Sequence, residues 1–248
     1  MSRIGVVALQ GGFGAHARAL RDLGHDAVEV RAEADLDLLE GLIFPGGEST
    51  AQLRLIDRHG LGRALQQLAA SGRPILATCA GLILAARHVI SPEQRSFGWI
   101  DATVARNAWG RQVDSFETFS DELPFSALSN EPASARSIGG RVNGRWVEGR
   151  AVDLDVLSPA ANGDSSPASE GAWRLPLVFI RAPRIVRVGA KVEVLATLGG
   201  EPILIRQGNI TGATFHPELT PDRRVHRAAF GDSSHASEDG YEKAITAH

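Results

Sequence analysis

The first 90 residues alternate short apolar runs with segments of helical periodicity, and this alternation limits the chain to a few folds. Segments 15–23 and 61–70 repeat apolar residues at helical intervals. The apolar runs of strand length are 4–9, 26–30, 42–44 and 74–78. Strands that alternate with helices at this spacing are typical of a parallel sheet covered on both faces. The sequence therefore predicts an α/β three-layer sandwich with a mostly parallel central sheet.

The pattern changes after about residue 95, where apolar runs are joined by short turns. We expect an antiparallel extension of the sheet here, with strands at 178–181, 192–197, 202–206 and 210–215. Two further helices are predicted, a buried one at 81–89 that ends before Pro92 and a closing one at 221–230.

One domain is expected over residues 1–230, followed by a polar C-terminal tail at 231–248. The least regular stretch, about 126–173, contains ANGDSSPASEG and is interpreted as an insertion at the surface, with a local strand at 145–147. Because loops accept added length, a tolerated insertion is the favoured interpretation, and a contact surface is the alternative.

Charge and composition exclude several function classes. The net charge is only -3 and the basic residues are scattered, so we expect no binding to nucleic acid or to an anionic membrane. The chain shows neither a signal-peptide pattern nor a membrane-spanning apolar stretch, which predicts a cytoplasmic protein. Cys79 is the single cysteine, so an internal disulfide and a four-cysteine zinc site are impossible. It is either a buried apolar side chain or a reactive thiol.

Cys79 follows a predicted strand and precedes a predicted helix, which is the placement of a nucleophile elbow. The amides and the dipole of the following helix favour a thiolate and can hold an oxyanion. Ala77 occupies the first position of the motif, where glycine is usual, and its methyl group fits if the turn packs slightly differently. A lone cysteine between apolar segments is more often a small core residue, so this motif is weak alone.

A thiol nucleophile needs a base, and His216 has the most suggestive setting of the eight histidines. It ends an apolar run, and Glu218 is close enough to bond its second ring nitrogen and fix the tautomer. The competing interpretation is a capping histidine beside a surface glutamate. The remaining histidines lack such a neighbour and are interpreted as structural or solvated: His16, His25, His59, His88, His226, His235 and His248.

The segment PGGEST at 45–50 follows the third strand, at the edge where open α/β sheets place their sites. Its adjacent glycines let the backbone approach a ligand. It lacks the Gly-Lys-Ser/Thr ending of a phosphate-binding loop, and a plain turn with Ser49 capping the next helix is the simpler interpretation. Arg106 and Arg181 could each meet a substrate carboxylate, although most arginines are surface groups.

Together these segments resemble the glutaminase subunits of pyridoxal 5'-phosphate synthase, a family of class I-type glutamine amidotransferases. The resemblance covers residues 3–125 and 174–230. Two of the segments that carry it, RNAWGRQVDSFE and FIRAP, are not shared by amidotransferases in general. The segments that carry it are LQGG at 9–12, PGGEST at 45–50, TCAGL at 78–82, RNAWGRQVDSFE at 106–117, FIRAP at 179–183 and FHPELT at 215–220.

The resemblance implies a glutamine amidotransferase domain with a Cys79, His216 and Glu218 catalytic triad that hydrolyses L-glutamine to L-glutamate and ammonia. It implies that the ammonia passes to a barrel-shaped synthase subunit that builds pyridoxal phosphate, and that no cofactor or metal is required. Glutaminase activity in this family is low until that partner docks. The matching glutamine-binding positions are Gly47, Glu48, Ser49, Arg106, Ile180 and Arg181, and the oxyanion region comprises Gln10, Gly46 and Ala80.

Three alternatives stay open beside this hypothesis. The first is a stand-alone cysteine amidase or hydrolase, which would act on another substrate without a synthase. The second is a non-catalytic regulatory binding subunit, disfavoured because a silent scaffold needs no thiol, base and orienting acid together. The third is a glutaminase that serves another synthase, disfavoured by RNAWGRQVDSFE and FIRAP.

Overall fold

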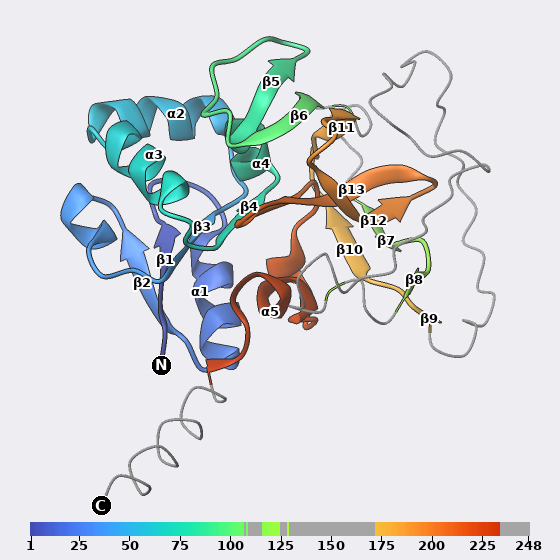
Figure 1. Ribbon diagram of the computed structural model, residues 1–248, viewed down its shortest axis with the longest axis horizontal. Coiled ribbons are helices and arrows are strands. Elements are labelled where there is room, and N and C mark those ends of the chain that lie inside the picture. Colours follow the sequence, from blue (N-terminus) through green and yellow to red (C-terminus); the bar gives the residue numbers. More distant parts are fainter. Residues whose placement is uncertain (107, 109–115, 125–127, 129–171, 234–248) are drawn as a thin grey trace, which may run out of the picture.

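Figure 1 shows the computed structural model of the chain, which describes residues 1–106, 108, 116–124, 128 and 172–233. The strand predicted at 145–147 lies outside these residues, as do most of the predicted insertion and the tail beyond 233.

Within the described residues the central sheet has seven strands in the order β12-β13-β14-β4-β3-β1-β2. The five strands from β14 to β2 are parallel, and the extension is antiparallel, since β13 pairs antiparallel with β14 and β12 pairs antiparallel with β13. The mostly parallel sheet with an antiparallel extension is therefore confirmed. The strands are β1 (Arg3–Val7), β2 (Asp26–Val30), β3 (Gly41–Phe44), β4 (Ile75–Thr78), β12 (Glu193–Leu198), β13 (Glu201–Gln207) and β14 (Ile210–Ala213).

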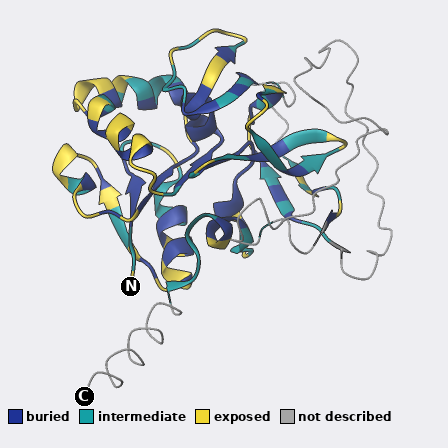
Figure 2. Cartoon of the chain, in the orientation of Figure 1, coloured by how far each residue is buried: buried dark blue, intermediate teal, exposed yellow. Residues whose placement is uncertain are grey.

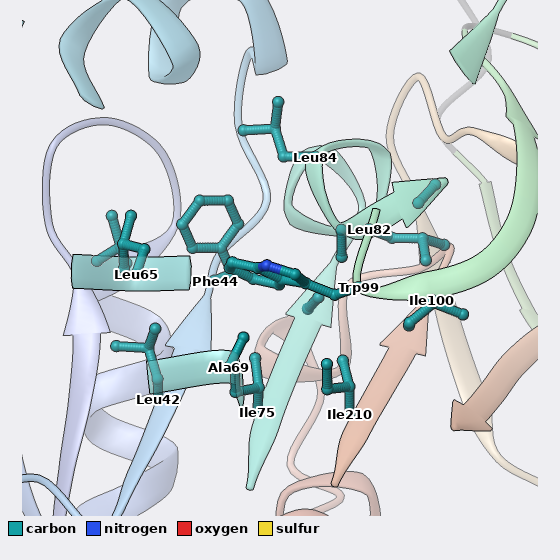
Figure 3. Packing of buried hydrophobic residues seen from close by; sticks show 14 of the residues in the cluster. Leu42, Phe44, Leu65, Ala69, Ile75, Leu82, Leu84, Trp99, Ile100 and Ile210 are labelled. Carbon is teal, nitrogen blue, oxygen red and sulfur yellow. The ribbon is translucent and has the colours of Figure 1, made fainter. Parts of the chain in front are cut away.

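Helices cover both faces of this sheet because alternate residues of each buried strand point to opposite sides. In β3, Leu42 and Phe44 pack into one apolar core with Leu65 of α3, whereas Ile43 packs into the other with Leu20 of α1 (Figure 3 shows the first core). Each such buried side chain contributes about 1.5–3 kcal/mol. The helices are α1 (Phe13–Asp22) and α5 (Arg224–Phe230) on one face, with α2 (Ser49–Arg58), α3 (Gly62–Ala70) and α4 (Ala80–Ala85) on the other.

Smaller sheets flank the sandwich on its β12–β13 side (Figure 1). One orders β11-β6-β5, a second pairs β10 with β7, and a third pairs β8 with β9. Their bounds are β5 (Ala86–Ile90), β6 (Ile100–Ala105), β7 (Phe116–Phe119), β8 (Leu123–Pro124), β9 (Ala172–Trp173), β10 (Pro176–Phe179) and β11 (Arg184–Val188). Two 3-10 helices complete the described elements, η1 (Glu33–Leu36) and η4 (Pro217–Leu219).

The buried helix predicted at 81–89 is wrong in its second half, because the chain leaves the helix at Ala85 and continues as β5. Phe97 donates its amide to the Leu84 carbonyl at 2.7 Å, which satisfies a helix-end acceptor from outside the helix. The β-branched residues Val89 and Ile90 then pair with β6, which suits their strand preference.

The carboxyl ends of β14, β4, β3 and β1 lie side by side in the sheet, so the loops that follow them share one edge. This edge is the usual place for a site in an open α/β sheet. It lies among the mostly buried residues at the centre of the molecule in Figure 2, and it receives Cys79 directly after β4.

Candidate active site

Cys79 occupies a sharp turn between β4 and α4, with φ 47° and ψ -105°, a left-handed region that non-glycine residues seldom adopt. The turn is held because the Cys79 amide donates to the Ala213 carbonyl of β14 at 2.8 Å. Gly81 permits the turn, since a Cβ there would lie 2.0 Å from the Phe44 carbonyl oxygen. The expected elbow is therefore present in the backbone, with Cys79 only 4% exposed.

His216 and Glu218 form a buried pair beside Cys79. His216 Nδ1 lies 2.8 Å from Glu218 Oε1, and the His216 amide donates to Val178 of β10 at 2.9 Å. Burial opposes a charge on His216, but hydrogen bonds to Cys79 and Glu218 outweigh it and raise the His216 pKa to about 10. Burial likewise opposes the Glu218 carboxylate, but the nearby histidines hold the pKa of Glu218 below its usual value.

Gly46, on the loop after β3, lies against both Cys79 and His216. A Cβ on Gly46 would be 2.4 Å from His216 Cε1 and 3.3 Å from the Cys79 Cβ. On its other side the Gly46 carbonyl accepts from Gly12 at 2.9 Å. A Cβ on Gly11 would lie 1.9 Å from the same oxygen. The loops after β1, β3, β4 and β14 therefore meet at this glycine.

The three residues of the predicted oxyanion region come from different elements around the turn. Gln10 Oε1 accepts from the Glu48 amide at 2.8 Å, which ties the loop after β1 to the loop after β3. Gly47 allows this approach, because a Cβ on it would be 2.4 Å from Gln10 Oε1. Ala80 begins α4 directly after Cys79, so its amide has no acceptor inside the helix.

Glu48, rather than Ser49, caps α2, and the cap predicted for Ser49 is therefore wrong. The Glu48 carboxylate accepts from the Ala51 amide at 2.9 Å, whereas the Ser49 hydroxyl donates to Gln94 Oε1 at 3.0 Å. The longer glutamate side chain can reach the helix amides and still meet a cation, because its other oxygen lies 3.5 Å from Arg106 Nη2.

Arg106 is held against the PGGEST loop rather than extended into solvent. Its Nη2 donates to Thr50 Oγ1 at 3.1 Å, and its side chain is 12% exposed. Ile180 and Arg181 lie on the loop after β10, which brings the Ile180 carbonyl to 4.0 Å from Cys79 Sγ. Arg181 is exposed and has φ 46°, the strained left-handed backbone seen at Cys79 itself.

Of the two roles expected for His16 and His226, structural or solvated, the structure supports the structural one, but it gives His16 a carboxylate neighbour that the sequence did not indicate. Both are fully buried behind the triad, and His16 Nε2 lies 3.3 Å from Glu218 Oε2. His16 Nδ1 lies 2.9 Å from His226 Nε2. The available signal was helical spacing, since His16 shares the buried face of α1 with Ala19 and Leu20.

The assembled side chains form a thiol, an imidazole and a carboxylate in contact, which is the arrangement of nucleophilic catalysis. Gly46 and Ala80 supply backbone beside the sulfur. In the part of the chain that the structure describes, no group of three or more His, Cys, Asp or Glu is placed to hold a metal ion. The same part contains no helix with the length and apolarity to cross a membrane.

Comparison with known proteins places the chain among amidotransferases. The model of the SNO glutamine amidotransferase family matches residues 6–139 and 169–231. The pyridoxal 5'-phosphate synthase subunit PdxT of Thermotoga maritima is 38% identical over 225 residues, which cover 91% of this chain and 96% of the relative. PdxT of Corynebacterium jeikeium is 41% identical over 226 residues, which cover 90% of this chain and 92% of the relative.

Solved structures agree with this assignment. A crystal structure of a glutamine amidotransferase has a TM-score of 0.66 at 37% identity, and the match covers 90% of this chain and 95% of that one. The PurLQS structure from Thermotoga maritima has a TM-score of 0.56 at 16% identity, over 92% of this chain and 97% of that one. This second likeness shows the fold alone.

Proposed function

The chain belongs to the SNO glutamine amidotransferase family, and from this premise we propose that it is the glutaminase subunit of a pyridoxal 5'-phosphate synthase. It hydrolyses L-glutamine to L-glutamate and ammonia and delivers the ammonia to the barrel-shaped synthase subunit. The observation that carries the proposal is the strained turn that sets Cys79 against a His216 paired with Glu218.

In the proposed reaction, Cys79 Sγ attacks the side-chain amide carbon of glutamine while His216 holds the thiol proton. The tetrahedral intermediate collapses when His216 gives that proton to the leaving nitrogen, so ammonia departs and a glutamyl thioester remains. Water then attacks the thioester with His216 as base, which releases glutamate and restores the thiol. Glu218 fixes the His216 tautomer, and the 2.8 Å contact supports this role.

Substrate binding is proposed for the residues that surround the sulfur. The amides of Gly46 and Ala80 stabilise the oxyanion, and Gln10 holds the loop that presents them. The remaining contacts to glutamine come from the PGGEST loop, from Arg106, which bonds Glu48 and Thr50 of that loop, and from the loop after β10, which reaches Cys79 through the Ile180 carbonyl. These are Gly47, Glu48, Ser49, Arg106, Ile180 and Arg181.

Docking of the synthase is proposed to complete the pocket. The low exposure of Cys79, with the Ile180 carbonyl 4.0 Å from its sulfur, supports a thiol that a small reagent can reach but that admits the larger glutamine fully only after a rearrangement. We propose a single amidotransferase domain over 1–230 with an insertion at about 126–173 and a C-terminal tail at 231–248. A cytoplasmic location fits this chemistry, because a reducing compartment keeps a catalytic thiol free.

The test is a reconstitution with the cognate synthase barrel, a pentose phosphate and a triose phosphate. Pyridoxal phosphate formation is measured with glutamine and, separately, with an ammonium salt as nitrogen source. We expect Cys79→Ala to abolish the glutamine-supported reaction and to leave the ammonium-supported one intact. His59→Ala, outside the site, is the control and should support both reactions.

The alternatives give different results in the same experiment. Glutamine turnover that the barrel does not stimulate would indicate a stand-alone amidase. Full glutamine-supported synthesis by Cys79→Ala would remove Cys79 as the nucleophile. A wild-type chain that binds the barrel and releases no glutamate would identify a regulatory binding subunit.

A further inference from the structure

We propose that His16 is a positioning residue of the triad, which holds the second carboxylate oxygen of Glu218 so that the first stays aimed at His216. The proposal rests on the proposed function, because it assigns a role within the same site. It concerns a fully buried imidazole that the reaction itself does not use.

His16 stands at the centre of a buried polar cluster formed by four elements. Its Nε2 lies 3.1 Å from Thr78 Oγ1 of β4, in hydrogen-bond geometry, and 3.3 Å from Glu218 Oε2 of η4. Its Nδ1 lies 2.9 Å from His226 Nε2 of α5. Glu218 Oε2 is buried and has no aligned hydrogen-bond donor in the described part of the chain. A buried carboxylate oxygen needs a donor, and the nearest imidazole nitrogen to it is His16 Nε2.

The chemistry of these groups fixes which nitrogen carries the proton. A carboxylate only accepts hydrogen bonds, so a lone pair on His16 Nε2 would face a second lone pair at 3.3 Å in a dry interior. The proton therefore belongs on His16 Nε2, shared between Glu218 Oε2 and Thr78 Oγ1. His16 Nδ1 is then an acceptor, and His226 Nε2 must be the donor to it.

The charge states of the cluster agree with a hydrogen bond from His226 Nε2 to His16 Nδ1 and a proton on His16 Nε2. The charged and titratable groups that face His16 are Glu218 and His216 from the segment after β14 and His226 from α5, while β4 contributes a hydroxyl and Arg223, the cap of α5, acts on His226. Burial lowers the pKa of His16, and it lowers that of His226 well below its usual value. Both imidazoles are therefore neutral, so each can donate through only one nitrogen.

The position of His16 on α1 also connects Glu218 to the oxyanion loop. α1 begins at Phe13, directly after the loop that packs on Gly46. At the same helix end, a Cβ on Gly12 would lie 3.0 Å from Glu218 Oε1. One helix thus places His16 beside the second carboxylate oxygen, and the absence of a side chain on its capping residue Gly12 leaves room for the first.

The experiment measures alkylation of Cys79 by iodoacetamide between pH 4 and 10 in the purified full-length chain. Cys79 is the single cysteine, so the label reports one site. In His16→Met, Glu218 Oε2 loses the imidazole nitrogen 3.3 Å from it but the carboxylate stays buried, so the carboxylate protonates at a higher pH. The acid limb is the pH range in which the alkylation rate rises with pH. We expect this limb to shift to higher pH by about one unit, so that the rate at a given pH on the limb falls about tenfold.

Two variants separate positioning from general structural damage. His16→Gln places an amide N–H near the former Nε2 and should restore the profile to within about threefold of wild type. His25→Met is the matched control, because His25 is also buried and its Nε2 bonds the Gly231 carbonyl at 3.0 Å, away from the triad. It should lower the melting temperature and leave the profile unchanged.

A profile for folded His16→Met that coincides with that of His25→Met overturns the proposal. If His16→Met does not fold, nitrogen-15 imidazole spectra of the wild-type chain decide: a proton on His16 Nε2 at pH 7 supports the assignment, and a proton on Nδ1 overturns it. Because alkylation requires neither glutamine nor the synthase, a chain without glutaminase activity could still show the His16 effect, so the two hypotheses fail separately.

Discussion

Replacing Gly46 with alanine tests the packing at the centre of the site. The new Cβ would lie 2.4 Å from His216 Cε1 and 2.9 Å from Nδ1, whereas ordinary contacts begin at 3.4 Å. The imidazole must therefore move by about 1 Å, and this movement strains the 2.8 Å contact that its Nδ1 makes to Glu218. Because the φ of Gly46 is not positive, alanine fits its backbone conformation, and the effect is one of space and not of backbone strain.

A displacement of about 1 Å in a catalytic group can lower a rate about a hundredfold, which corresponds to roughly 2.7 kcal/mol of transition-state stabilisation. Overpacking should also cost about 1–3 kcal/mol of folding stability. We expect Gly46→Ala to lower kcat for synthase-stimulated glutamate release by that factor, with a smaller change in KM. Melting temperature is measured in parallel, so that loss of fold is separated from loss of alignment.

Gly14→Ala is the matched control, because a Cβ on Gly14 meets nothing within 4 Å. Gly14 lies in α1, so alanine there should stabilise the helix by about 0.5–1 kcal/mol and leave kcat unchanged. A folded Gly46→Ala variant with more than a fifth of wild-type kcat would refute the reasoning, since the collision would then be absorbed without moving His216.

Three further predictions concern charge. The His216 pKa is raised to about 10, so protonation of His216 stabilises the fold fully below about pH 6.5, and this contribution is lost as the pH rises through 10. Urea unfolding of wild type and His216→Asn should therefore show a difference in the free energy of unfolding that shrinks from pH 7 to 10. Arg184 and Glu201 form a mostly buried bidentate pair at 2.6 and 2.7 Å, so Arg184→Met should cost about 3 kcal/mol in urea unfolding, and adding Glu201→Met should recover part of it. Arg106→Met should raise KM for glutamine about tenfold with little change in kcat, because Arg106 supports Glu48 and Thr50 in the proposed substrate loop; unchanged steady-state KM would contradict this.

The framework of the site was predictable because Cys79 and His216, the proposed nucleophile and base, each directly follow an apolar run. Cys79 and His216 are far apart in sequence, but the strands before them pair in parallel, with Thr78 opposite Ala213. Parallel strands present their carboxyl ends at one edge, so the order of elements was enough to expect a shared site. The order of strands in the sheet follows from pairing between distant segments, which periodicity does not encode.

Two kinds of feature escaped prediction for physical reasons. The segment 86–90 follows α4 without a glycine or proline to end the helix, and only its pairing with β6 makes it a strand. His16 reads as an ordinary helical histidine because its partners lie far along the chain, Thr78 by 62 residues and His226 by 210. Burial of a polar side chain depends on such partners, and sequence spacing does not reveal them.

The proposed insertion at about 126–173 is compatible with the proposed site because of where the chain leaves and re-enters the described residues. Leu123 of β8 pairs with Trp173 of β9, so the departing and returning strands are hydrogen-bonded neighbours. A loop whose ends are already joined can grow at a cost that rises only with the logarithm of its length. The triad loops instead follow β4 and β14 of the central sheet. Added residues between β8 and β9 therefore leave the strands that position Cys79 and His216 in their original register.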